Sequence, residues 1–216
     1  MNIKVISLKR RPDRRLKFFK NFHKYFIFEF VDAMDGLEYT LTEEDKKMIK
    51  GNIYDTMDIH IPSLVCANRM HMKLYEECIR LNEPIIIFED DAELIKPIDF
   101  SLEEIYNRTD LDVFWLMPDM VSILTYIVWP SGAKILLDYI KEVGLSDGLD
   151  IKYTGIKYSG RLREGKLHDE YFTQYPGVES DITPLPYYGN TKEEFDGFLR
   201  WQKDPNNQKG DSSWTV

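Results

Sequence analysis

The chain has 216 residues and a net charge of −9, from 28 basic and 37 acidic residues. Its length suits one hydrophobic core, and its 43% hydrophobic and 30% charged residues are ordinary for a globular protein. Because a net negative charge opposes binding to a nucleic-acid backbone, nucleic-acid partners are not expected.

The sequence also lacks the patterns that direct a chain out of the cytoplasm. It does not open with the apolar segment of a signal peptide, and no apolar run approaches about 18 residues. The two cysteines, Cys66 and Cys78, have no C-x-x-C spacing, which favours free thiols in a reducing compartment. We therefore expect a cytoplasmic protein without a transmembrane segment.

Strands and helices are predicted in alternation along the first two thirds of the chain. The signals are apolar periodicity, Pro12 in a first helical turn, and a capping box at residues 42–45. The predicted strands are 3–8, 27–31, 85–88, 113–116 and 126–129, and the predicted helices are 12–22, 42–50, 63–81 and one from 130. This order indicates a three-layer α/β fold with a mainly parallel central sheet. We expect one domain at 1–200 and a tail or linker at 201–216.

The stretch 144–165 follows the last of these helices. It has five glycines, includes Tyr153 and Tyr158, and shows no strong period. The sequence therefore predicts a long loop here, of the kind that is mobile when empty and closes over a bound ligand.

A cluster of acids follows the most apolar predicted strand. The sequence IIIFEDD places Glu89, Asp90 and Asp91 directly after four apolar residues. Such a strand is covered on both faces, and open α/β sheets bind ligands at the carboxyl ends of their strands. Adjacent carboxylates repel one another, and a divalent cation relieves that repulsion. The alternative is a solvated acidic turn, and strand alternation points Asp90 away from its two neighbours.

The first predicted strand is followed by a basic block. Three readings stay open for it: a phosphate site, a membrane-surface patch, or a solvated helix face. Arg11 and Arg14 lie on the same sheet edge as the acids, where planar guanidinium donors suit a diphosphate. The block comprises Lys9, Arg10, Arg11, Arg14, Arg15, Lys17 and Lys20.

A chain of short motifs resembles glycosyltransferase family 25, which includes lipopolysaccharide sugar transferases and collagen galactosyltransferases. The motifs span residues 5–182 and are VISLKRRPDRR, VDAMDG, HMKLY, FEDD, YIVWPSGAKILLDYI, DGLDIKY and QYPGVESDI. Aligned on His71, the chain has Ala67 and Met70 where the family has Cys and Ser. We expect these two differences to bear on donor-sugar and acceptor preference rather than on the acids.

The resemblance implies a GT-A fold, a nucleotide-sugar donor and a Glu-Asp-Asp motif in the role of the Asp-x-Asp metal site. The expected enzyme is a hexosyltransferase that moves a sugar, UDP-hexose being the expected donor, to a hydroxyl of a glycan or glycoprotein acceptor. Mn²⁺ or Mg²⁺ would be held by Asp91, with Glu89 as second ligand or as a ribose contact, and would neutralise the leaving diphosphate.

The resemblance also implies roles for other residues. Asp150 and Asp181 are the candidate bases that deprotonate the acceptor if the enzyme inverts, with Asp147 behind them. His71 is read as a satisfied core residue or a donor-site residue, and His168 as a surface residue or a late metal ligand. The expected donor-binding residues are Ser7, Leu8, Arg11, Arg14, Asp32, Ala33 and His71.

Two other functions stay open on the sequence. A metal-dependent phosphohydrolase or nucleotidyltransferase also places acids at strand ends, and a non-catalytic carbohydrate-binding scaffold would keep the fold alone. The sequence has neither a Gly-x-Gly-x-x-Gly nor a Walker pattern, so dinucleotide oxidoreductases and P-loop enzymes are not indicated.

Overall fold

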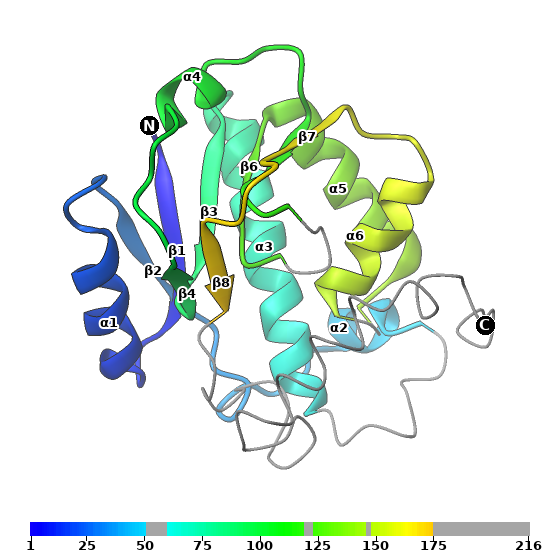
Figure 1. Ribbon diagram of the computed structural model, residues 1–216. Coiled ribbons are helices and arrows are strands. Elements are labelled where there is room, and N and C mark those ends of the chain that lie inside the picture. The colour runs from blue at the N-terminus through cyan, green and yellow to red at the C-terminus, as the bar shows by residue number, and fades with distance from the viewer. Residues whose placement is uncertain (51–59, 119–122, 146–147, 175–216) are drawn as a thin grey trace, which may run out of the picture.

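The computed structural model of the protein describes residues 1–50, 60–118, 123–145 and 148–174, without the side chains of residues 150 and 151. In this part of the chain the main sheet has six strands in the order β2-β1-β3-β6-β5-β7, and β4 pairs with β8 in a second sheet (Figure 1). The strands are β1 Ile3–Leu8, β2 Glu29–Ala33, β3 Ile85–Glu89, β4 Ala92–Leu94, β5 Val113–Trp115, β6 Thr125–Val128, β7 Glu164–Lys166 and β8 Phe172–Gln174. The helices are α1 Pro12–Phe22, α2 Glu43–Met48, α3 Ile61–Leu81, α4 Leu102–Tyr106, α5 Pro130–Val143 and α6 Leu149–Tyr158.

The predicted mainly parallel sheet is confirmed. Strand β1 pairs in parallel with both β2 and β3, and β5 pairs in parallel with β7. Of the six strands, only β6 runs the other way, since its pairings with β3 and β5 are antiparallel. Consequently the carboxyl ends of β1, β2 and β3 lie next to one another at one edge.

The core has two parts, one on each face of the sheet, which gives the three layers. Along β3 the fully buried side chains alternate: Ile86 and Phe88 pack in the cluster with α1, while Ile85 and Ile87 pack in the cluster with α3, α5 and α6. This two-sided burial confirms β3 as an interior strand. In the same view α3, α5 and α6 group together on one side of the sheet (Figure 1).

The prediction of a long loop at 144–165 is wrong. Helix α6 and strand β7 occupy most of that stretch, because Leu149, Tyr153 and Ile156 repeat at helical spacing and are buried against α5. The sequence did not predict this helix because its glycines, which are unfavourable within helices, argued for a loop. Strand β2 also begins two residues later than predicted, and the short elements β4, β8 and α4 carry too few residues for a periodic signal.

The capping box of α2 forms as predicted and is tied to α3. The Thr42 hydroxyl accepts from the Asp45 backbone NH, and the Asp45 carboxylate accepts from the Thr42 backbone NH. Asp45 is fully buried and also accepts from Tyr39 and from Arg69 of α3. The Thr42 hydroxyl donates to this carboxylate as well, so it has four donors, and α2 and α3 are joined through one buried ion.

None of the helices in the described ranges combines the length and the hydropathy that a membrane crossing requires.

Candidate active site

The candidate active site is a cavity of about 180 Å³ at the carboxyl ends of β1, β2 and β3. Strand register places Leu8 opposite Ala33 and Ile6 opposite Glu89, so side chains distant in sequence meet at this edge. This volume is smaller than the roughly 300 Å³ or more that a small-molecule pocket usually encloses. The cavity is lined by Ile6, Ser7, Leu8, Arg14, Ala33, Met34, Asp35, Gly36, Ser63, Ala67, Met70, Glu89, Asp90, Asp91 and Gln174.

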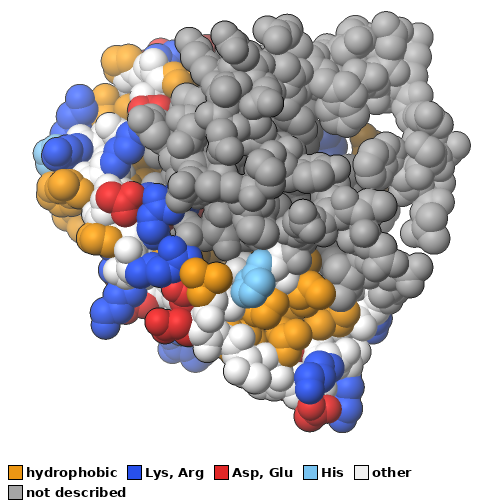
Figure 2. All heavy atoms as spheres, turned by 90° about the horizontal axis from the view of Figure 1, so that it is seen from below, with side chains coloured by type: hydrophobic (Ala, Val, Ile, Leu, Met, Phe, Trp, Pro, Cys, Tyr) orange, Lys and Arg blue, Asp and Glu red, His pale blue; other side chains and the backbone are white. Residues whose placement is uncertain are grey.

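Figure 2 views the molecule from this lower side. Lys and Arg side chains gather at the end formed by α1, on the left of the view. The basic block predicted from the sequence therefore lies beside the acidic strand end, as expected from the parallel pairing of β1 and β3.

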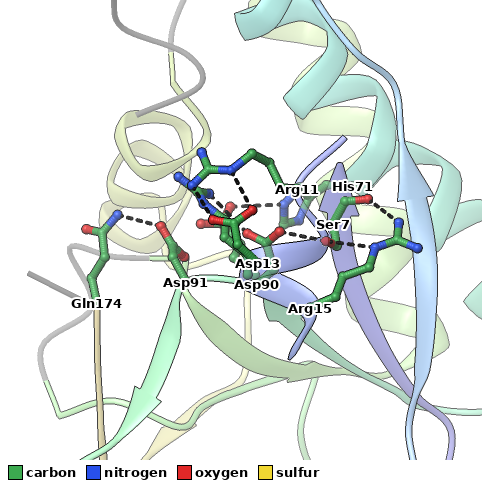
Figure 3. A network of polar contacts seen from close by, with 10 residues as sticks. Ser7, Arg11, Asp13, Arg15, His71, Asp90, Asp91 and Gln174 are labelled. Carbon is green, nitrogen blue, oxygen red and sulfur yellow. Dashed lines mark hydrogen bonds and ion pairs between the residues drawn. The ribbon is translucent and has the colours of Figure 1, made fainter. Parts of the chain in front are cut away.

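Asp91 is held in an unusual electrostatic state. Its Oδ2 accepts a hydrogen bond from Gln174 Nε2 at 2.8 Å (Figure 3), whereas its Oδ1 is buried without a hydrogen-bond partner among the described residues. Burial, and after it the charge of Glu89, raise the pKa of Asp91 to about 7. The site thus holds a carboxylate whose negative charge is poorly compensated.

Asp90 turns the other way, as strand alternation predicted. Its Oδ2 accepts from the Ser7 hydroxyl at 2.6 Å, and its Oδ1 pairs with Arg14 at 3.1 Å. Asp90 is buried, so these bonds join the ends of β1 and α1 to the end of β3. This carboxylate has a bracing role, which leaves Glu89 and Asp91 to meet a ligand.

The residues present fit a divalent cation. Carboxylate oxygens suit Mg²⁺ and Mn²⁺, and Mg²⁺ is commonly held by one or two carboxylates together with waters and substrate phosphates. Among the described residues, no group of three or more His, Cys, Asp and Glu side chains is arranged to hold a metal. Glu89 and Asp91 match the two-carboxylate case, and the unpartnered Oδ1 of Asp91 is the atom that a cation would satisfy.

The arginines of the basic block take different positions. Arg14 lines the cavity, whereas Arg11 pairs with Asp13 at 2.9 Å and is not among the lining residues. Arg15, which the sequence did not single out, donates to the carbonyl of Ser7 at 2.9 Å and to Asp32 at 2.6 Å. The exposed Asp32 therefore joins β2 to α1 beside the cavity, and the bond from Arg15 lowers its pKa.

His71 lies beneath the acidic strand end as a core residue. It is buried, its Nδ1 is 2.7 Å from the Tyr126 hydroxyl, and its Nε2 is 3.6 Å from a Glu89 carboxylate oxygen. Burial lowers the pKa of His71 to about 3, so the imidazole is neutral at physiological pH. Its ring stacks on Tyr126 beneath the strand end, and it is not among the residues that line the cavity.

Comparison with known proteins decides the family. The family model for glycosyltransferase family 25, described as an LPS biosynthesis protein, matches residues 1–116, which is more than half of the chain. This chain belongs to glycosyltransferase family 25. It is therefore a glycosyltransferase, and the resemblance noted in the sequence is confirmed.

Solved structures similar to this family 25 member are distant ones. One is a glycosyltransferase involved in glycosylation of the major capsid of PBCV-1, 11% identical over 83% of this chain and 95% of that chain, with a TM-score of 0.47. Another is the galactosyltransferase LgtC in complex with donor and acceptor sugar analogs, 10% identical over 94% and 99%, with a TM-score of 0.43. No curated protein matches the sequence significantly. The family assignment rests on the family model and not on these likenesses.

Helix α3 supplies one wall of the transferase's cavity. Ala67 and Met70, which stand where the family has Cys and Ser, both line it, as does Ser63. The opposite turn approaches closely: a Cβ added to Gly36 would lie 2.3 Å from the Ser63 Cα. The two family differences therefore lie at the ligand cavity itself.

Gln174, Ser63 and Gly36 were missed by sequence reasoning. Gly36 had a signal as part of an Asp-Gly turn, but its approach to α3 is a tertiary contact. Gln174 is the first residue of the motif QYPGVESDI, but the motif gives it no role, and it reaches Asp91 because β8 pairs with β4, which places Gln174 opposite Ala92.

The side chains of the three predicted bases lie outside the described part of the structure. Asp150 is the second residue of α6, and its side chain lies outside the described part of the structure. Asp181 and Asp147 also fall outside the described residues. His168 is exposed in the connection from β7 to β8, which agrees with its reading as a surface residue.

Proposed function

We propose that this glycosyltransferase transfers a hexose from UDP-hexose to a hydroxyl of a glycan or glycoprotein acceptor, with Mn²⁺ or Mg²⁺, in the cytoplasm. The observation that carries the proposal is the state of Asp91: a buried oxygen that has no hydrogen-bond partner among the described residues and a pKa raised to about 7, beside Glu89, in a cavity at the sheet edge. That combination disfavours the charged carboxylate in the free protein and favours it once a cation binds.

The residues around the cavity have distinct roles in this proposal. Glu89 and Asp91 would hold the cation, which would supply positive charge to the leaving diphosphate. Arg14 lines the same cavity from α1 and offers planar donors to phosphate oxygens. Asp90 and Ser7 keep the ends of β3 and β1 in register, so the ligand-binding atoms are positioned before the donor arrives.

If the transfer inverts the anomeric configuration, a further carboxylate takes the proton of the acceptor hydroxyl. As the acceptor oxygen attacks the anomeric carbon, its proton passes to a base and the bond from that carbon to the diphosphate breaks. We retain Asp150 and Asp181 as the candidates. Full transfer activity of both Asp150→Asn and Asp181→Asn would reject both.

Titration of UDP and of uridine, each with and without Mn²⁺, tests the proposed donor and metal. We expect Mn²⁺ to strengthen UDP binding by at least about tenfold and to leave uridine unchanged, because only the diphosphate shares the cation. A scaffold would show no metal-dependent binding. A phosphohydrolase would cleave UDP-hexose at the same rate with and without an acceptor and would yield no glycosylated product.

Arg14→Ala is expected to weaken UDP by roughly tenfold while leaving uridine within about twofold, because the lost contacts are charge-assisted bonds to phosphate. Arg11→Ala is the matched control, since Arg11 pairs with Asp13 and does not line the cavity. Calorimetric titration of both variants with both ligands provides the comparison. Equal losses for the two variants, or for UDP and uridine, would contradict the assignment of Arg14.

A further inference from the structure

Helix α1 has large apolar side chains on both of its sides. Phe18 and Phe22 are buried in the core, as the inner face of a surface helix requires. Leu16 lies on the opposite side and Phe19 on the flank beside it, and they are 54% and 48% exposed. Polar residues normally fill such positions, so the outward face of α1 is more apolar than packing within this chain requires.

Cations lie among these exposed apolar residues. Lys20 is four residues after Leu16, which places it on the same helical face, and Lys24 follows in the turn after α1. We call Leu16, Phe19, Lys20 and Lys24 the α1 outer face. On the left of Figure 2, hydrophobic side chains lie beside Lys and Arg at this end of the molecule.

The acids near α1 are already engaged by other cations of the basic block. Four arginines have carboxylate partners, and Lys17 lies 3.6 Å from Glu93. By contrast, Lys20 and Lys24 are exposed, and within the described residues neither forms an ion pair. The arginine pairs are Arg10 with Asp35, Arg11 with Asp13, Arg14 with Asp90 and Arg15 with Asp32.

We propose that the α1 outer face docks on an anionic lipid surface. Leu16 and Phe19 would enter the headgroup region, and Lys20 and Lys24 would meet lipid phosphates. Because the chain as a whole carries −9, an anionic membrane repels most of its surface and attracts this face, which sets the orientation of the bound protein.

A second copy of the chain fits this surface less well. A symmetric dimer would bring the two copies of the same patch together and so gather four lysines, two from each copy, in one interface. Docking on lipid also relates this face to the site, because Arg14 on the same short helix lines the cavity. The donor site would then lie within roughly one helix length, ~16 Å, of the lipid surface. The proposal itself does not depend on the metal or on the donor.

Flotation of the full chain with vesicles tests the proposal. We compare phosphatidylcholine alone with a mixture containing about 30% phosphatidylglycerol, at about 50 mM and about 500 mM NaCl. The protein should float with anionic vesicles at low salt, at least about fivefold more than with neutral vesicles or at high salt. Lys20→Glu with Lys24→Glu, and separately Leu16→Ser with Phe19→Ser, should each lower binding at least about tenfold.

Lys134→Glu with Lys141→Glu on α5 is the matched control, since it makes the same change in net charge at two other exposed positions. It should bind within about twofold of the wild type. Circular dichroism of each variant confirms that the fold is kept. Equal losses for the α1 and α5 variants, or no binding of the wild type to anionic vesicles, would overturn the proposal. So would concentration-dependent dimerisation, measured by light scattering without vesicles, that the Leu16 and Phe19 changes abolish.

Discussion

Asp91→Asn should lower metal-dependent sugar transfer by at least about a hundredfold while the protein remains folded. An amide keeps the shape of the side chain and its bond from Gln174, but it removes the anionic oxygen that a hard cation requires. The measurements are transferase turnover and UDP binding in Mn²⁺. Asp138→Asn, an equivalent change at an exposed position on α5, is the control and should retain full activity.

The same substitution should affect stability with a defined sign. A folded-state pKa of about 7 for Asp91 means that the unfolded chain ionises this group more readily, so its charge destabilises the metal-free fold above the unfolded pKa of about 4. Without metal, the melting temperature of Asp91→Asn at pH 8 should therefore equal or exceed that of the wild type, and the difference should shrink by pH 4. Near wild-type turnover of Asp91→Asn in Mn²⁺ would contradict the metal assignment, whatever its stability.

Asp45→Ala should lower the free energy of unfolding by about 3–5 kcal/mol, which is the usual cost of removing one partner of a buried ion pair. The substitution removes the acceptor of bonds from Thr42, Tyr39 and Arg69, and it leaves the Arg69 guanidinium, whose side chain is only 21% exposed, without this carboxylate. Urea denaturation measures the change. Glu43→Ala, on the exposed side of α2 with only a surface ion pair to Lys46, should cost less than about 1 kcal/mol.

The contribution of Asp45 should also depend on pH. Burial acts to raise the pKa of Asp45, but hydrogen bonds from Thr42, Tyr39 and Arg69 outweigh it and hold this pKa well below its usual range. A depressed folded pKa stabilises the fold above the unfolded pKa of about 4, and the contribution is lost as the pH falls below that value. The difference between wild type and Asp45→Ala should therefore be full at pH 7 and smaller at pH 3. A pH-independent difference, or a loss under about 1 kcal/mol at pH 7, would show that the cluster is not a buried ion pair of the expected kind.

The strands and the helix that carry the site were largely predictable, because they depend on local periodicity. The continuous apolar run before Glu89 identified an interior strand, and Pro12 placed the start of α1 at the observed residue. Parallel strands bring their carboxyl ends to one edge, so the neighbourhood of Arg14 and Glu89 followed from the order of strands. Period-two alternation was enough to separate Asp90 from the acids on either side of it.

The sequence by itself determined the α/β order, the interior strand β3 and the acidic end that it carries, because each depends on residues a few positions apart. Only the tertiary structure decided that Arg14, paired with Asp90, lines the cavity and that Arg11, paired with Asp13, does not, because the two arginines differ by one helical turn and not in chemistry. Tertiary structure likewise brought Gln174 to Asp91, since that bond spans 83 positions and depends on the pairing of two three-residue strands too short to carry a signal of their own.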